Sequence, residues 1–163
     1  MQTLQVLTIV IAAVAMALSL AHALEWPGKM RLSKDEYLAV QPIYYPGFAI
    51  GGGAEPLAIL LTLVLLFLTP SGAAFWLTLS GFASLVAMHV AYWLLTHPVN
   101  RFWVEHVDLD RFGGGFFRLF GRPAGSGEPD WTLLRDRWEM SHIVRAAFGG
   151  AGFVLLVCAL AVS

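Results

Sequence analysis

The ten Lys and Arg residues of this chain lie in only two stretches, residues 25–54 and 97–145. The rest of the sequence is strongly apolar and has no basic side chain. Charged residues make up 13% of the 163 positions, about half of the roughly 25% that is usual in a soluble domain. This pattern is typical of a small integral membrane protein whose basic loops share one side of the bilayer.

Four apolar runs are long enough to cross a bilayer, which requires about 20 residues in a helix. They cover residues 3–24, 48–68, 73–97 and 138–162. The turn-forming segment Thr69-Pro70-Ser71-Gly72 separates the second run from the third. We therefore predict an all-α fold class, an integral membrane four-helix bundle in a single domain, with long loops at 25–47 and 98–137.

The two basic stretches coincide with the two long loops. Lys29, Arg31 and Lys34 lie in the first, and the other seven of the ten basic residues follow residue 97. Loops rich in Lys and Arg stay in the cytoplasm, so we expect a multi-pass protein of the bacterial-type inner (cytoplasmic) membrane with both termini outside. Ala21-His22-Ala23 resembles a signal cleavage site, but no basic residue precedes the apolar run, so we expect a retained helix.

The second loop contains more than a linker. Residues 101–120 mix aromatic with charged side chains, which predicts an amphipathic segment lying in the membrane interface. The region 121–129 is rich in Gly and Pro and predicts a flexible hairpin. Asp130 has the character of an N-cap, so the fourth helix is expected to begin near Trp131, and Pro98 is expected to end the third.

Ionisable residues inside the predicted spans are the strongest indication of a functional site. Glu55 and Arg145 each lie seven residues into a span, which places both about 10 Å from the loop side. His89 lies about 12 Å deep, and His22 and His142 lie about one turn in. An unpaired charge at this depth costs several kcal/mol, so we predict that Glu55 and Arg145 are paired within one cavity.

Two interpretations of this group remain open. It could be an ion pair that only sets the helix register, or it could line a ligand or reaction pocket, which the three neighbouring histidines favour. Helical periodicity places further candidates on the same faces: Trp138, His142, Arg145 and Gly149 on the fourth helix, and His89, Trp93 and His97 on the third. Trp138 could instead be an interfacial anchor, and Asn100 could cap the backbone.

The same residues include possible ligands of a metal ion or a haem. Glu139 and His142 have the Glu-x-x-His spacing of di-metal bundles, but such sites need two of these pairs and two further carboxylates, so we predict no metal site. A b-type haem with axial imidazoles from His22, His89 or His142 is an alternative; beyond haem, the sequence identifies no cofactor. With a net charge of −1 and no recognisable motif, the chain is not expected to bind nucleic acid.

Two motifs point to a family. His97-Pro98-Val99-Asn100 contains a Pro-x-Asn pattern, and Trp138, His142 and Arg145 form a Trp-x3-His-x2-Arg pattern. Together they resemble the small four-span anthrone oxygenase-like membrane proteins, a family whose members mostly have no assigned function. Trp26-Pro27-Gly28-Lys29 and Tyr44-Tyr45-Pro46-Gly47-Phe48 depart from its pattern and indicate a separate subgroup.

The resemblance implies a four-helix membrane bundle and, in some members, oxidation of an electron-rich aromatic polyketide by dioxygen. It also implies functional roles for Asn100, Trp138, His142 and Arg145. We therefore predict a membrane oxidoreductase that acts on a hydrophobic phenol- or quinol-like small molecule, with a cofactor-independent oxygenase as one form of this prediction. His142 would be the base, Arg145 the anion clamp and Glu55 its partner.

The predicted substrate-binding residues are Asn100, Trp138, His22, His89 and His97. The alternatives are a non-catalytic subunit or assembly factor of a larger membrane complex, and a haem-binding electron carrier. The expected partners are the lipid bilayer, a hydrophobic small molecule, and either a membrane protein or further copies of the chain.

Overall fold

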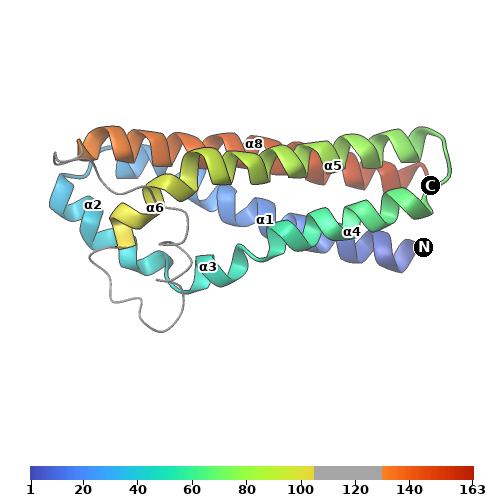
Figure 1. Ribbon diagram of the computed structural model, residues 1–163, viewed down its shortest axis with the longest axis horizontal. Coiled ribbons are helices and arrows are strands. Elements are labelled where there is room, and N and C mark those ends of the chain that lie inside the picture. Colours follow the sequence, from blue (N-terminus) through green and yellow to red (C-terminus); the bar gives the residue numbers. More distant parts are fainter. Residues whose placement is uncertain (105–129) are drawn as a thin grey trace.

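The computed structural model describes residues 1–104 and 130–163, and these residues are helical with no strand among them. Four helical stretches are long and apolar enough to cross a membrane: Gln2–Lys29, Gly47–Leu68, Ala73–Asn100 and Trp131–Ala161. They lie along one another in an elongated bundle, with both termini at the same end (Figure 1). The all-helical class and the four apolar helices are confirmed. The predicted interfacial segment, beyond residue 104, and the hairpin at 121–129 lie outside the described residues.

Two helices form the long axis of the bundle, α1 (Gln2–Lys29) and α8 (Trp131–Ala161). Helix α8 begins where expected, and the Asp130 carboxylate accepts a hydrogen bond of 2.9 Å from the backbone N–H of Thr132. The predicted start of the first loop at residue 25 is wrong, because α1 continues one more turn. Glu25 and Lys29 pair across that turn at 2.9 Å, the i,i+4 arrangement that stabilises a helix beyond its apolar run.

The first loop is itself partly helical. It contains α2 (Lys34–Val40), the 3-10 helix η1 (Gln41–Tyr44) and α3 (Gly47–Gly51). Helix α2 begins with a capping box, in which the Ser33 backbone N–H donates to the Glu36 carboxylate at 2.8 Å. The sequence pattern Ser-x-x-Glu is typical of such a start, although residues 25–47 as a whole are predicted above as a loop.

The other two apolar stretches contain α4 (Ala54–Leu68) and α5 (Ala73–Ala91). Helix α5 continues through a π-helical turn, η2 (Tyr92–Thr96), into α6 (His97–Val104), so the prediction that Pro98 ends the third helix is wrong. Pro98 has no N–H to donate to the Leu94 carbonyl. That carbonyl accepts instead from Arg137 Nη2 of α8 at 2.7 Å, which satisfies the exposed backbone group and lets the helix continue.

Small residues allow the helices to approach one another closely. A Cβ atom at Gly149 would lie 3.1 Å from Met88 Sδ and 3.3 Å from the Cα of Met16. Cβ atoms at Gly81 and Gly152 would each lie 3.4 Å from the other glycine's carbonyl oxygen. The glycines of α8 therefore serve close helix packing, which brings α1, α5 and α8 together beside the loop-side cavity described next.

Candidate active site

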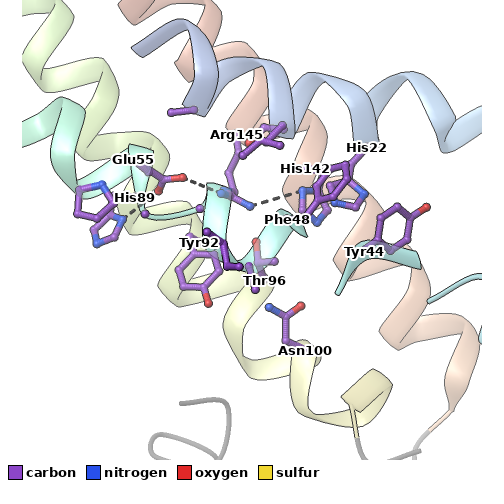
Figure 2. A pocket seen from close by; sticks show the side chains of 18 of the residues that line it. His22, Tyr44, Phe48, Glu55, His89, Tyr92, Thr96, Asn100, His142 and Arg145 are labelled. Carbon is purple, nitrogen blue, oxygen red and sulfur yellow. Dashed lines mark hydrogen bonds and ion pairs between the residues drawn. The ribbon is translucent and has the colours of Figure 1, made fainter. Parts of the chain in front are cut away.

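A cavity of about 550 Å³ lies in the loop-side half of the bundle. Its lining comes from α1, η1, α3, α4, α5, η2, α6 and α8. Its walls are mostly aromatic or aliphatic. The ionisable residues predicted at membrane depth face one another across it (Figure 2). The lining residues with polar groups are Ser19, His22, Tyr44, Tyr45, Glu55, His89, Tyr92, Trp93, Thr96, Asn100, Trp138, His142 and Arg145.

The centre of the site is a buried ion pair. Glu55 lies in the first turn of α4, and its Oε2 accepts from Arg145 Nη2 of α8 at 2.6 Å. The two residues are only 3% and 8% exposed, so the pair is largely removed from solvent. The predicted pairing of Glu55 with Arg145 in one cavity is confirmed. A carboxylate in the first turn is also favoured by the positive end of the helix dipole.

The second oxygen of Glu55 positions His89. Glu55 Oε1 lies 2.9 Å from His89 Nδ1, and Trp93 Nε1 donates to His89 Nε2 at 3.0 Å. An indole N–H can only donate, so His89 Nε2 carries the lone pair and Nδ1 carries the proton. This is the carboxylate–imidazole arrangement in which the carboxylate fixes the tautomer and leaves the far nitrogen basic.

His142 adopts the opposite tautomer to His89, with its proton on Nε2 instead of Nδ1. Arg145 Nη1 lies 3.5 Å from His142 Nδ1, and a guanidinium has no lone pair to offer. His142 Nδ1 is therefore the acceptor, and the neutral ring carries its proton on Nε2. Both His142 Nε2 and Arg145 Nε are buried without a hydrogen-bond partner among the described residues. Helix α8 thus holds two unsatisfied N–H donors, on residues that line the cavity but with almost no accessible surface on the atoms themselves.

A second polar cluster lies closer to the loops, around Lys29, which is 5% exposed. Its Nζ lies 2.9 Å from Glu25 Oε2, 3.6 Å from Glu139 Oε1 and 3.3 Å from His22 Nδ1. The ammonium also lies over the rings of Tyr44 and Trp138, at 4.8 and 4.9 Å from their centroids. Sequence analysis missed this cluster because Lys29 was placed in a loop.

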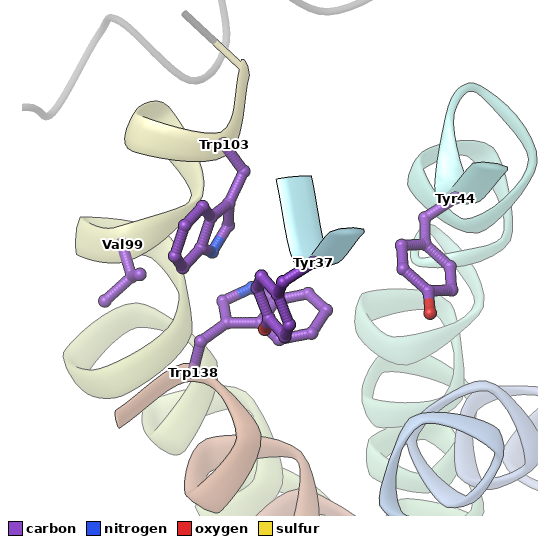
Figure 3. Packing of buried hydrophobic residues seen from close by; sticks show 5 residues of the cluster. All are labelled: Tyr37, Tyr44, Val99, Trp103 and Trp138. Carbon is purple, nitrogen blue, oxygen red and sulfur yellow. The ribbon is translucent and has the colours of Figure 1, made fainter. Parts of the chain in front are cut away.

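Two tyrosines orient the carboxylates of the second cluster. Tyr37 donates to Glu139 Oε1 at 2.8 Å, and Tyr44 donates to Glu25 Oε2 at 2.7 Å. Burial, together with the neighbouring Glu139, raises the pKa of Tyr37. Burial and the hydrogen bond to Glu25 raise the pKa of Tyr44. Both therefore remain protonated donors. Tyr37 belongs to the aromatic cluster at the loop end of the bundle, where it lies beside Trp103 and Trp138 (Figure 3).

Ring contact between two histidines joins the two clusters. The His22 and His142 centroids are 4.1 Å apart, with 33° between the ring planes. Axial haem ligands must lie on opposite faces of the macrocycle, and rings in direct contact leave no space for one. Both nitrogens of His89 are already engaged. These residues therefore do not fit a bis-histidine haem. Within residues 1–104 and 130–163, no group of three or more His, Cys, Asp and Glu side chains is placed to hold a metal ion.

The remaining predicted residues have different placements. Trp138 is 3% exposed, and its Nε1 donates to Asn100 Oδ1 at 2.7 Å. The anchor interpretation of Trp138 is therefore wrong, and the Asn100 side-chain oxygen binds an indole. Both residues line the cavity, whereas His97 lies outside the lining and contacts the Tyr92 hydroxyl at 3.1 Å.

Most of the aromatic residues that line the cavity were not predicted from the sequence. Tyr44, Tyr45 and Phe48 come from the first loop, and Tyr92 and Trp93 come from the π-helical turn. The run Tyr44-Tyr45-Pro46-Gly47-Phe48 departs from the family pattern, and its aromatic density is the signal that could have predicted a cavity wall. A wider π turn re-aims the side chains that follow it, and such turns are frequent at functional sites.

No family model matches this chain, and neither a curated protein nor a solved structure shows significant similarity to it. The chemistry of the cavity therefore carries the functional argument.

Proposed function

We propose that this chain is a multi-pass membrane protein of the anthrone oxygenase-like kind, an oxidoreductase or oxygenase that acts on a hydrophobic phenol- or quinol-like molecule held in the cavity. The four apolar helices support the membrane location. The concentration of basic residues at the loop end supports a cytoplasmic position for that end, with both termini outside.

The shape and lining of the cavity support this ligand class. Its volume of about 550 Å³ falls within the range of roughly 300–1,000 Å³ for small-molecule sites. Aromatic walls suit a planar, electron-rich ring. The unpartnered N–H groups of His142 and Arg145 suit an oxygen atom that gains negative charge, because fixed donors stabilise an oxyanion best away from water.

The geometry favours His89, rather than His142, as the general base. Glu55 holds the His89 proton on Nδ1, so Nε2 can accept a proton once the substrate displaces Trp93 Nε1. In His142 the basic nitrogen Nδ1 already faces the Arg145 guanidinium at 3.5 Å. We therefore propose His89 as base, Glu55 as its orienting partner, and Arg145 with His142 as the oxyanion clamp.

The proposed reaction begins with proton transfer from an acidic O–H or C–H of the substrate to His89 Nε2. For an anthrone-like substrate, the resulting carbanion forms a C–O bond with dioxygen. The peroxide anion then takes up a proton, and loss of water leaves a carbonyl group. For a quinol, two electrons and two protons pass to dioxygen and give quinone and hydrogen peroxide. Both substrates and dioxygen partition into the bilayer.

One observation carries this proposal: the oriented Glu55–His89 pair and the two unpartnered donors of α8 share one cavity. The test is dioxygen consumption and quinone absorbance with a hydroxylated anthrone and with a quinol, using purified protein in lipid nanodiscs. His89→Gln should lower kcat by about a hundredfold or more. Trp76→Phe is the matched control, because Trp76 is 64% exposed and lies near the opposite end of the bundle.

Dioxygen consumption no greater than that of empty nanodiscs, or equal kcat values for wild type and His89→Gln, would refute the enzymatic proposal. If His142→Ala and Arg145→Ala also retained full activity in cells, a role as a non-catalytic subunit or assembly factor would be favoured instead.

A further inference from the structure

We infer that Glu25, Lys29 and His22 form a proton-transfer path that connects the loop end of the bundle to the cavity and delivers a proton to the ligand oxygen. This inference rests on the proposed function, because it supplies the proton that the peroxide or phenolate anion takes up. It assigns a role to a cluster that the oxyanion clamp and the base do not use.

The three residues lie in the last turns of α1, and Lys29 is within hydrogen-bonding range of both Glu25 and His22. Glu25 Oε2 lies 2.9 Å from Lys29 Nζ, and Lys29 Nζ lies 3.3 Å from His22 Nδ1. The exposed fraction changes along the path: the Glu25 side chain is 42% exposed, whereas Lys29 is 5% exposed and His22 is 4% exposed. His22 lines the cavity. The path therefore runs from an accessible carboxylate to a buried imidazole at the cavity wall.

The tautomer of His22 gives the path its direction. An ammonium group can only donate, so His22 Nδ1 accepts from Lys29 and the neutral ring carries its proton on Nε2. Nε2 is then the ring nitrogen that can meet a ligand oxygen. When Nε2 gives its proton to an oxyanion, Nδ1 can take one from Lys29. The Glu25 carboxylate relays a proton from water to the neutral Lys29 amine and is ionised again afterwards, so one proton has moved inward. His22 then carries its proton on Nδ1, and a flip of the imidazole ring restores the starting tautomer.

The surroundings of Lys29 align its ammonium group for this step. Three protons on Nζ face three acceptors, which are Glu25 and His22 on α1 and Glu139 on α8. Tyr37 from α2 and Tyr44 from η1 hold the two carboxylates by hydrogen bonds. The other charged and titratable neighbours of His22 are His142 and Arg145 on α8. One of the three ammonium protons is thus directed at an imidazole although a buried carboxylate is near.

The path can be interrupted without removing the charge. Lys29→Arg keeps a cation between Glu25 and Glu139 but does not release a proton near neutral pH. His22→Gln keeps an acceptor for Lys29 but cannot exchange protons between two ring nitrogens. Trp76→Phe again serves as the control at the far end of the bundle. A structural role for Lys29 would be largely preserved in Lys29→Arg, whereas a proton-transfer role would not.

The experiment follows the ionisation of a chromogenic phenol, para-nitrophenol, bound to the protein in nanodiscs. After a stopped-flow pH jump, absorbance reports how fast the bound phenolate exchanges its proton with bulk water. We expect exchange in Lys29→Arg and His22→Gln to be slower by about tenfold or more, with para-nitrophenol affinity within about twofold of wild type and the control unchanged.

Equal exchange rates in wild type and both variants, with binding retained, would overturn the proton path and leave the proposed function standing. If wild type does not bind para-nitrophenol in competition with the anthrone, the ligand class of the proposed function fails, and the path fails with it.

Discussion

Breaking the Glu55–Arg145 ion pair should destabilise the fold more than removing the pair as a whole. The two side chains meet at 2.6 Å and are almost fully buried. Glu55→Gln would leave the Arg145 guanidinium without a carboxylate, beside the His142 ring and 5.1 Å from the centroid of the Tyr92 ring. Arg145→Met would leave a buried carboxylate that contacts His89 alone among its present polar partners. Loss of one partner of a buried pair costs about 3–5 kcal/mol.

The double variant Glu55→Gln with Arg145→Met removes both charges together. It should cost only about 1–3 kcal/mol, the usual penalty for hydrogen-bonding groups such as those of His89 and His142 that lose a partner. Because the two single losses sum to roughly 6–10 kcal/mol, the cycle should show a coupling free energy of about 3 kcal/mol or more. Each single variant should also lower the melting temperature by on the order of 10 °C, at about 2–4 °C per kcal/mol.

The assay is unfolding in mixed detergent micelles followed by tryptophan fluorescence, for wild type, both single variants and the double variant. Asp136→Asn is the control, because Asp136 forms an exposed ion pair with Arg135 at 2.8 Å, and such pairs contribute at most about 1 kcal/mol. Strictly additive losses, or single variants no less stable than the control, would refute the buried pair as the centre of the site.

Three further predictions concern packing, hydrogen bonding and pH. Gly149→Ala should lose about 1–3 kcal/mol of unfolding free energy, because the added methyl meets Met88 and the Met16 backbone, whereas Gly150→Ala has open space and should be neutral or stabilising. Trp138→Phe should cost about 1–3 kcal/mol, because it leaves Asn100 Oδ1 unpaired in a buried position; the same unfolding assay checks both, and equal stabilities within either comparison would contradict it. Burial and Glu139 raise the pKa of Tyr37, and burial and Glu25 raise that of Tyr44, above the usual value of 10.0. Above that pH only the unfolded tyrosines ionise, so stability should fall, and less steeply in a Tyr37→Phe, Tyr44→Phe double variant; equal slopes would argue against the shifts.

Much of the site was predictable, because in a helix the spacing of residues gives both their depth along the helix axis and the face on which they lie. Counting from the ends of the apolar runs placed Glu55 and Arg145 at one depth, and the structure pairs them. The capping box at Ser33 was also readable from the sequence. Lys29 was harder, because hydropathy marks the end of an apolar run and gives no sign that the helix continues past it.

Helix geometry alone could not predict which histidine acts as the base and which as a donor. His89 and His142 carry the same side chain at similar depth. The structure places a donor-only indole at His89 Nε2 and a donor-only guanidinium at His142 Nδ1. A neutral imidazole adopts the tautomer that its neighbours require, so the identity of the base depends on contacts between helices.

The sequence by itself determined the number of apolar helices, the placement of both termini at one end, and the half of the bundle that collects the ionisable residues. These features follow from the lengths of the apolar segments and from the positions of the charged residues between and within them. The rotation of each helix, the continuation of the third helix through Pro98, and the meeting of His22 with His142 were decided only by the tertiary structure. Glycines, a freed carbonyl and aromatic loop residues set those contacts, and the energy of each depends on which groups from distant segments come together.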